Sequence, residues 1–351
     1  MDREQMKKIG LIVAFALLAG ISCWATTESL HLLLPSWPKF FCWVVTIAFF
    51  IIASYGSKLI MDSLNMNIYL EKRKTRMVLG ILLLLVFWLC FSMPTNTHTF
   101  FYRAAINDVV LLDVAKTKSY LQDLADNSSV NNRIKANIEK VESEVKALQI
   151  ALENEIDNKA NAGFGDRAKE HLRGLAHALG VAEIPTLSGS GNTPAKRKAL
   201  KEQYSQIIHS LLENRIEKIK VQGMDNRVSY YQPEAKRLVE ELKKAEVALA
   251  EEKAKGNVNQ KLISNVDALL VRSYTTVNNY SDLINISDED KEVYKSGVTR
   301  THRMLSVVEV WKDIFNGKFT GREVVLWILL SVLVDIAAFV FFSLATARDD
   351  E

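Results

Sequence analysis

The sequence predicts an all-α integral membrane protein with four transmembrane helices and a large extramembrane helical domain. Four apolar runs support this prediction, at residues 9–25, 40–55, 77–93 and 324–344. A helix needs about 20 apolar residues to cross a hydrocarbon core of about 30 Å, and these runs approach or reach that length. The intervening residues 94–322 are polar, and their apolar positions recur at intervals of three and four, which is the period of a helix.

The first 93 residues form an N-terminal membrane region with three predicted spans. Arg3, Lys7 and Lys8 precede the first apolar run, which is also how a signal peptide begins. The run is longer than a typical signal-peptide core and a second span follows closely, so we interpret it as a retained transmembrane helix. A short connection is expected at residues 26–39. Pro94 is expected to end the third span, because proline disrupts a helix interior.

Residues 323–351 form a C-terminal region with the fourth span and a short acidic tail. The spacing of Thr320 and Glu323 matches a capping box, which predicts that a helix begins there. The fourth span contains one ionisable side chain, Asp335. The insert between the third and fourth spans is therefore expected to be tied to the membrane at both ends.

The distribution of Lys and Arg near the spans predicts the orientation. The N-terminus, the loop at 57–76 and the C-terminal tail together hold nine of these residues, and the opposite side holds five. By the positive-inside rule the first group is cytoplasmic. Both termini are then cytoplasmic and residues 94–322 are extracytoplasmic. We predict the plasma membrane as the location, or the inner membrane if the protein is bacterial.

The insert contains one long apolar seam between residues 130 and 156. Its spacings of four and three persist for nearly four heptads, which is typical of a coiled coil or a long bundle helix. Such a narrow stripe favours self-association. The residues of this candidate oligomerisation seam are Ile134, Ile138, Val141, Val145, Leu148 and Leu152.

Further helices are expected on both sides of the seam. Asn127 is expected to separate the seam from the helix that leaves the third span. Thr193 has the side chain of a good N-cap, and the proline after it suits the first helical position. Pro233 is expected to open the next helix, and residues 287–315 to form the last outer one. The Gly- and Ser-rich stretch 187–193 is expected to be a loop.

Charge and cysteine usage exclude several classes of protein. Residues 94–322 hold 34 Lys and Arg against 31 Asp and Glu, so they lack the basic excess of a nucleic-acid-binding domain. The cysteines Cys23, Cys42 and Cys90 lie one in each of the first three apolar runs. This placement argues against a disulfide framework and against a cysteine-based metal site.

The side chain that most needs an explanation is Asp335, near the middle of the fourth span. A carboxylate there costs about 2.5–3.5 kcal/mol on insertion scales. Ser331 lies one turn earlier on the same helix face and is expected to share a polar seam with it. Three interpretations stay open: a protonated or hydrogen-bonded contact with another span, an aqueous or ion path, and a subunit interface.

The sequence contains no recognisable catalytic, cofactor or metal motif. His171 and His177 are six residues apart and lie on different helix faces, whereas a metal pair on one helix needs a spacing of four. No nucleophile elbow, phosphate-binding loop or dinucleotide-binding turn occurs. We therefore expect neither a cofactor nor an enzyme.

We expect a non-enzymatic multi-pass membrane protein whose outer helical domain mediates sensing, scaffolding or self-association. Its expected partners are the lipid bilayer and either a second copy or another envelope protein, bound through the helical domain. The alternative is an oligomeric ion channel or transporter with Asp335 in the membrane path.

Overall fold

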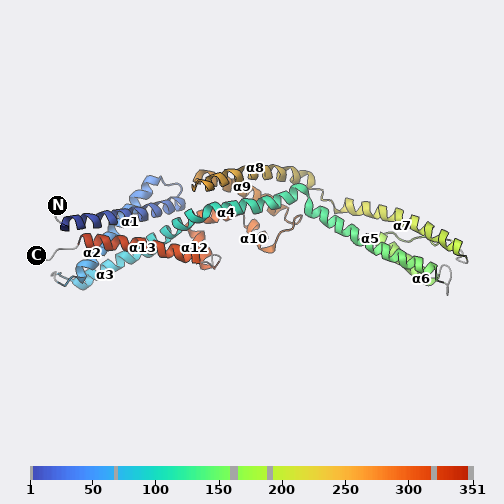
Figure 1. The fold of residues 1–351 in the computed structure, drawn as a ribbon, viewed down its shortest axis with the longest axis horizontal. Helices are drawn as coiled ribbons and strands as arrows, with labels where there is room; N and C mark the ends of the chain where they lie inside the picture. Colours follow the sequence, from blue (N-terminus) through green and yellow to red (C-terminus); the bar gives the residue numbers. More distant parts are fainter. Residues whose placement is uncertain (1–2, 67–69, 159–164, 188–192, 318–321, 347–351) are drawn as a thin grey trace. The chain divides into compact units, whose positions relative to one another are not determined.

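The computed structural model describes residues 3–66, 70–158, 165–187, 193–317 and 322–346, which Figure 1 shows as a ribbon. Within these ranges the regular elements are helices and there is no strand, which confirms the all-α prediction. The chain divides into two compact units. The first is Met1–Lys116 with Leu242–Arg272 and Ser296–Glu351, and the second is Thr117–Glu241 with Ser273–Lys295.

The elements follow one another along the chain with short connections. In order they are α1 (Arg3–Leu33), α2 (Lys39–Leu64), α3 (Arg73–Phe87), the π-helix η1 (Trp88–Ser92), α4 (Met93–Asp126), α5 (Ser128–Ile156), α6 (Asp166–Leu179), α7 (Pro194–Gly223), α8 (Val228–Ala254), α9 (Gln260–Asn279), α10 (Asp288–Ser296), α11 (Arg300–Leu305), α12 (Val307–Phe315) and α13 (Arg322–Ala345).

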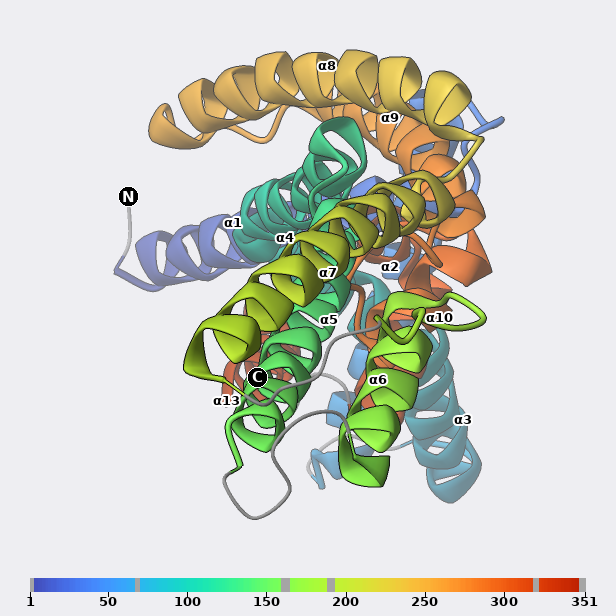
Figure 2. The same cartoon turned by 90° about the vertical axis from the view of Figure 1, so that its right-hand side faces the viewer.

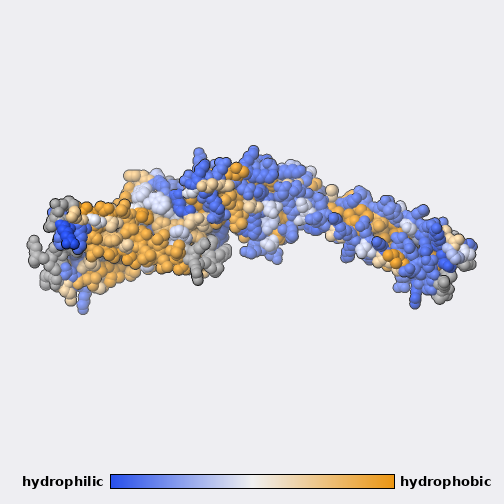
Figure 3. Space-filling view, in the orientation of Figure 1, coloured by the Kyte–Doolittle hydropathy of each residue, from blue (hydrophilic) through white to orange (hydrophobic). Residues whose placement is uncertain are grey.

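Four helices are long and apolar enough to cross a membrane, as the sequence predicts. They are α1, α2, the continuous helix Arg73–Asp126 formed by α3, η1 and α4, and Val324–Ala345 within α13. Large apolar side chains cover these helices, and Figure 3 shows the resulting orange surface. A continuous apolar surface of this kind marks contact with lipid or protein rather than with water.

The four candidate spans pack as one bundle, in which α1 lies along α13 and α2, and α2 lies along α3. Phenylalanine rings fill its core. The rings of Phe50 and Phe339 stack with centroids 5.3 Å apart, and Phe87 meets both of them edge-on. Because stacked and edge-to-face ring pairs have preferred geometries, these three rings fix α2, α3 and α13 relative to one another.

Two glycines allow α2 and α3 to approach closely. A Cβ atom added to Gly80 would lie 2.6 Å from the backbone oxygen of Gly56 and 2.9 Å from Ile60. A Cβ added to Gly56 would lie 3.0 Å from the Cβ of Leu83. Small residues at such positions are typical of membrane helix pairs, where close van der Waals packing replaces the hydrophobic driving force.

The expectation that Pro94 ends the third span is wrong. The helix continues through it into the 34-residue α4, and the π-helix η1 immediately precedes it. The backbone N–H of Met93 donates to the carbonyl of Trp88, five residues earlier. A proline lacks an N–H and crowds the carbonyl four residues before it, so a π-turn at this point accommodates Pro94 within a continuous helix.

The expected connection at 26–39 is also shorter than predicted. The helix α1 continues to Leu33 and buries Thr26, Thr27, Glu28 and Ser29 against its neighbours. Hydropathy places a boundary where polar residues begin, but here a complete helical turn, residues 25–30, is buried by its neighbours. Tertiary packing therefore overrides the composition of the segment.

In the second unit, α5 packs along α6 and α7, which lie nearest the viewer in Figure 2. Their shared core contains Val145 and Leu152 from α5, Leu175 from α6 and Tyr204 from α7. The Tyr204 hydroxyl accepts a hydrogen bond from the backbone N–H of Leu187 at 2.9 Å. Burial raises the pKa of Tyr204 above its usual value.

Two predicted helix boundaries agree with the structure. Asn127 separates α4 from α5 and has a positive φ of 56°, a left-handed conformation that asparagine tolerates better than most residues. Thr193 caps α7, because its Oγ1 accepts a hydrogen bond from the backbone N–H of Lys196.

Two other boundary predictions are wrong. Pro233 lies inside α8, which begins at Val228, since a turn over Asp225–Arg227 already starts the helix there. Residues 287–315 form three helices instead of one, because Gly297 has a φ of 68° and Ser306 caps a new helix.

Three further predictions fall outside the described residues. These are the capping box that begins at Thr320, the centre of the loop 187–193 and the acidic C-terminal tail.

The close approach of α2 and α3 predicts that Gly80→Ala destabilises the bundle. The new methyl group meets the Gly56 backbone, which cannot turn aside as a flexible side chain can, so we expect a loss of about 1–3 kcal/mol, as for other overpacked sites. Unfolding in mixed micelles measures it. Gly20→Ala is the matched control, because a Cβ at Gly20 has no atom within 4 Å. Equal stability of the two variants would contradict the packing described here.

Candidate functional site

The candidate site is a cluster of polar side chains around Asp335 in the core of the bundle. The Ser22 hydroxyl donates to Asp335 Oδ1 at 2.7 Å, and the Ser92 hydroxyl donates to Oδ2 at 2.6 Å. Asn96 Nδ2 lies 3.5 Å from Oδ1. We call these four residues the Asp335 cluster. It joins three separate helices, since Ser22 is on α1, Ser92 and Asn96 are on the continuous helix Arg73–Asp126, and Asp335 is on α13.

The local backbone explains how Ser92 and Asn96 come to lie together. Residues four apart on a helix share one face, and the π-turn of η1 ends at Ser92. A π-turn inserts one extra residue and so changes which side chains face a neighbouring helix. This part of the chain is therefore irregular where it meets the carboxyl group of Asp335.

Asn96 organises the two serines. Its side-chain nitrogen donates to the Ser22 oxygen at 2.8 Å and to the Ser92 oxygen at 3.0 Å. Its side-chain oxygen accepts from the Thr26 hydroxyl at 2.9 Å. The amide thereby uses both donors and its acceptor inside the bundle, which buried polar groups require.

Asp335 is enclosed, with an exposed fraction of 1%, so it has no direct contact with solvent. Among the described residues, no lysine, arginine or histidine forms a bond with it. A buried carboxylate ordinarily has a cationic partner. The Asp335 cluster instead offers neutral hydroxyl and amide donors.

Ser331 does not join the Asp335 cluster by hydrogen bonding. It is fully buried one turn before Asp335 on α13, but its hydroxyl has no hydrogen-bond partner among the described residues. The sequence prediction paired the two because residues four apart share a helix face. Sharing a face does not determine which residue the neighbouring helices contact.

A second group of polar side chains continues the polar interface between α1 and α4. The Ser29 hydroxyl donates to the backbone oxygen of Thr95 at 2.7 Å and lies 2.8 Å from His98 Nδ1. Thr99 donates to the backbone oxygen of Ala25 at 2.6 Å. The other ring nitrogen of His98 lies 3.1 Å from the backbone oxygen of Met304 in α11.

Glu28 anchors the end of this interface. Its side chain is buried and forms ion pairs with Lys39 and Arg103. The Arg103 guanidinium also lies over the ring of Trp24, 5.5 Å from its centroid. A buried charge needs such partners, and here Gln260 of α9 donates a further hydrogen bond at 3.2 Å.

The candidate oligomerisation seam is largely covered by its own chain. Val145 and Leu152 are buried in the core with α6 and α7, and Val141 and Leu148 pack against that core. Ile134 packs at the other end of the seam, where a Cβ on Gly223 would lie 2.5 Å from it. The apolar stripe predicted from the sequence therefore contacts α6 and α7 of the same molecule.

A groove of about 440 Å³ opens between α5, α6 and α7 beside the seam. Lys140, His177 and Arg215 supply basic groups to its lining, and Val141 and Ile219 supply apolar ones. Glu144 is the acidic residue of the lining. The groove thus combines apolar surface with an excess of basic side chains.

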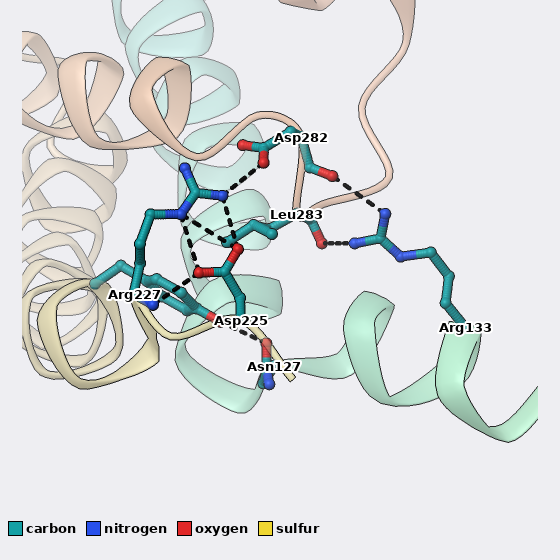
Figure 4. Close-up of polar contacts among 7 residues, drawn as sticks. Asn127, Arg133, Asp225, Arg227, Asp282 and Leu283 are labelled. Atoms are coloured by element: carbon teal, nitrogen blue, oxygen red, sulfur yellow. Dashed lines mark hydrogen bonds and ion pairs between the residues drawn. The ribbon is translucent and has the colours of Figure 1, made fainter. Parts of the chain in front are cut away.

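The junction between α4 and α5 is held by a separate polar network, shown in Figure 4. The Tyr231 hydroxyl donates to the Asn127 side chain at 2.7 Å. Arg227 pairs with both Asp225 and Asp282, and Arg133 donates to the backbone oxygens of Asp282 and Leu283. The Arg227 guanidinium holds the pKa of Asp225 below its usual value.

The sequence analysis predicts that His171 and His177 do not form a metal-binding pair. Among the residues that the structure describes, no group of three or more His, Cys, Asp or Glu side chains could hold a metal ion. Cys23 and Cys42 are buried and Cys90 is exposed, and all three are free thiols.

Comparisons with family models, with curated proteins and with solved structures find no match for this chain.

Sequence reasoning identified Asp335 but missed its partners. A signal for them was present: Ser22, Thr26 and Ser29 recur at intervals of four and three, as do Ser92, Thr95 and Thr99 at three and four. Hydroxyl side chains at helical spacing on two neighbouring spans are typical of polar contacts between membrane helices.

The bonds of the Asp335 cluster predict that Asp335→Ala lowers the free energy of unfolding in lipid by about 1–2 kcal/mol. Ser22, Ser92 and Asn96 then lose a shared acceptor, and each such bond contributes about 0.6 kcal/mol or more. Ser331→Ala is the control, with an expected loss below about 0.5 kcal/mol, because its hydroxyl has no hydrogen-bond partner in the part of the chain that the structure describes. An equal loss in both variants would show that the cluster does not stabilise the bundle.

The junction network predicts that Arg227→Gln speeds hydrogen exchange at residues 280–285. The variant loses both carboxylate contacts of Arg227, whereas the control Arg237→Gln loses contacts only with Glu234 and Glu241 of its own helix. The folded-state pKa of Asp225 is lowered, so the ion pair of Asp225 with Arg227 stabilises the fold fully above the unfolded-state pKa of Asp225.

This stabilisation is lost as pH falls through the folded-state pKa. The difference in exchange rate between Arg227→Gln and the native protein should therefore become smaller as pH falls between these two pKa values. Similar protection in the native protein and in Arg227→Gln at neutral pH would exclude this role.

Proposed function

We propose that this chain is a non-enzymatic multi-pass membrane protein whose outer helical region binds a partner and transmits that binding to the membrane bundle. The observation that supports it is the continuity of Arg73–Asp126, which belongs both to the bundle and to the helical region. A partner that shifts the outer part of α4 then acts directly on η1, Ser92 and Asn96.

Contacts outside the bundle reinforce this continuity. The Trp311 indole of α12 donates to the backbone oxygen of Pro94 at 3.1 Å, and His98 contacts the backbone of Met304 in α11. These bonds attach α11 and α12, which precede the fourth span, to the start of α4. The segments leaving the third span and entering the fourth therefore move together.

The groove beside the seam is the surface we assign to the partner. Its basic side chains and apolar floor suit a helix or extended segment with acidic and apolar residues. Because α6 and α7 already cover Val145 and Leu152, a second copy would meet this groove rather than the whole seam. A second copy of this chain and another envelope protein are thus two candidate occupants of the same groove.

The proposal includes the orientation predicted from the basic residues. With both termini in the cytoplasm, residues 94–322 and the groove face outward at the plasma membrane or a bacterial inner membrane. The ion pairs of Glu28 with Lys39 and Arg103 support this arrangement, because they give two of the basic residues on the outer side a local partner.

Cysteine protection tests the partner and the orientation together. In a variant with Cys23, Cys42 and Cys90 changed to Ala, a single cysteine replaces Gln222 in the groove or, as a control, the exposed Lys146 of the same unit. We expect an impermeant maleimide to label the control in intact cells and to label Gln222→Cys at least fivefold more slowly. Purified protein should label equally at both sites if the occupant is another envelope protein, and should keep the protection of Gln222→Cys if the occupant is a second copy of this chain. Adding Lys140→Glu should remove the protection in cells in either case.

The outcomes separate the two parts of the proposal. Equal labelling of both cysteines in intact cells would contradict a partner in the groove. Labelling of neither cysteine before lysis would contradict the orientation, and the protection comparison could then be repeated on lysed cells.

A second candidate function is an oligomeric ion channel or transporter with Asp335 in its path. The polar residues that line the contact of α1 with η1 and α4 favour it, since they lead from Asp335 through Thr26 toward Ser29 and His98. The enclosure of Asp335 within one bundle counts against an open path. Currents in planar bilayers that are the same for the native protein and Asp335→Asn would exclude it.

A further inference from the structure

The hydrogen bonds to an ionised Asp335 have a fixed direction, because carboxylate oxygens only accept. A serine hydroxyl has one proton to donate. The oxygens of Ser22 and Ser92 both accept from Asn96 Nδ2, and each hydroxyl then gives its proton to one oxygen of Asp335. The arrangement therefore supplies donors to both carboxylate oxygens and leaves Asp335 with no acceptor for a proton of its own.

Hydrogen bonds from neutral groups satisfy only part of what a buried carboxylate needs. An ionised group in an apolar environment is costly without a counter-charge, and membrane carboxyl groups are accordingly rare. No cation bonds to Asp335 among the described residues. A proton is the smallest species that removes the charge without enlarging the site.

The surroundings of Asp335 contain few other groups that could take up this proton. From α1 the Cys23 thiol faces it, and from α4 the nearest histidine, His98, is occupied by Ser29 and the Met304 carbonyl. From α2, Phe50 stacks on Phe339 of α13 and Ser57 forms a hydrogen bond with Ser343 of α13, and neither side chain is ionisable near neutral pH. Cys90 of η1 is exposed and so points away from the bundle core.

We propose that Asp335 is a reversible proton-binding site inside the bundle. On protonation the new O–H of Asp335 donates to one of the two serine oxygens, and that serine turns its own proton to the carbonyl four residues earlier in its helix, Leu18 for Ser22 or Trp88 for Ser92. Serines in membrane helices commonly form such bonds. No covalent bond other than the O–H of Asp335 forms or breaks.

Protonation changes how α13 is held in the bundle. In the ionised state Asp335 accepts from two helical segments at once, so the carboxylate joins α13 to both α1 and η1. In the neutral state one of those two bonds reverses and the charge that strengthens both is lost, since bonds to ionised groups are about twice as strong as neutral ones. The site therefore couples proton uptake to the contact of the fourth span with the first and third, and it does so without conduction and without a bound partner.

Infrared difference spectroscopy of the full-length protein in lipid vesicles tests the proposal. Above about pH 5.5 exposed Asp and Glu are ionised, so a carboxylic-acid C=O band that persists there marks a buried acid. We expect one band that appears and disappears reversibly with pH in that range and shifts on isotopic labelling of aspartate. Asp335→Asn should abolish it, whereas Asp313→Asn, a buried aspartate paired with Arg303 outside the spans, should leave it unchanged.

Serine variants show whether the band belongs to the Asp335 cluster. Removing a hydroxyl that bonds the carboxyl group changes the frequency of its C=O stretch, so Ser22→Ala and Ser92→Ala should each shift the band. Ser54→Ala should not, because the Ser54 hydroxyl donates to the Phe50 carbonyl of its own helix. These variants also cover the case in which Asp335→Asn fails to fold.

Three results would overturn the proposal. The first is the absence of any Asp335-dependent acid band, and the second is a band that does not respond to pH. The third is a band lost at constant pH when choline is replaced by sodium, which would make the Asp335 cluster a site for a monovalent cation instead of a proton.

Discussion

The structure depends on how one carboxyl group is accommodated between helices in lipid. Membrane helices gain little from burying apolar side chains against one another, because lipid is equally apolar, so polar bonds and close packing decide which helices pair. Ser22 and Ser92 provide such bonds to Asp335 from two sides, and the Gly56–Gly80 contact provides close packing between α2 and α3. The fourth span returns to the bundle after more than 200 intervening residues. The Asp335 cluster gives that return a specific position against α1 and η1.

The sequence predicted the helices and the carboxyl group, but not the contacts that explain the carboxyl group. Hydropathy detects long apolar runs and a single charge within one, so the four spans and Asp335 were accessible. Ser22 and Asn96 were missed, because one serine changes the hydropathy average of an apolar run little and Asn96 lies beyond the end of the third predicted span. The helical spacing of the hydroxyl residues is a signal that a hydropathy average does not detect. The π-turn before Pro94 could not be predicted either. A proline usually ends or kinks a helix, whereas here the helix continues through Pro94.

The apolar seam is a second case in which the sequence predicts an element but not its contacts. Periodicity establishes that Val145 and Leu152 form one stripe on a helix, but it does not identify what covers the stripe. The covering helices α6 and α7 carry stripes of their own, with Leu175 and Tyr204 in the shared core. Complementary stripes within one chain fold together before a second copy can bind, because their effective concentration is high. The surface that we propose for a partner is the groove, which combines residues from three helices and is not visible in any one stretch of sequence.

Energetics indicate why the bundle retains an acid at this position. Inserting a carboxylate near the bilayer centre costs about 2.5–3.5 kcal/mol, whereas a hydrogen bond between spans contributes about 0.6 kcal/mol on average. Three such bonds recover only about 2 kcal/mol, and an apolar side chain at this position would incur no insertion cost at all. Stability alone therefore does not favour Asp335. What a carboxyl group offers and an apolar or amide side chain does not is a change of charge on binding one proton, and the two serines and Asn96 are arranged to respond to that change.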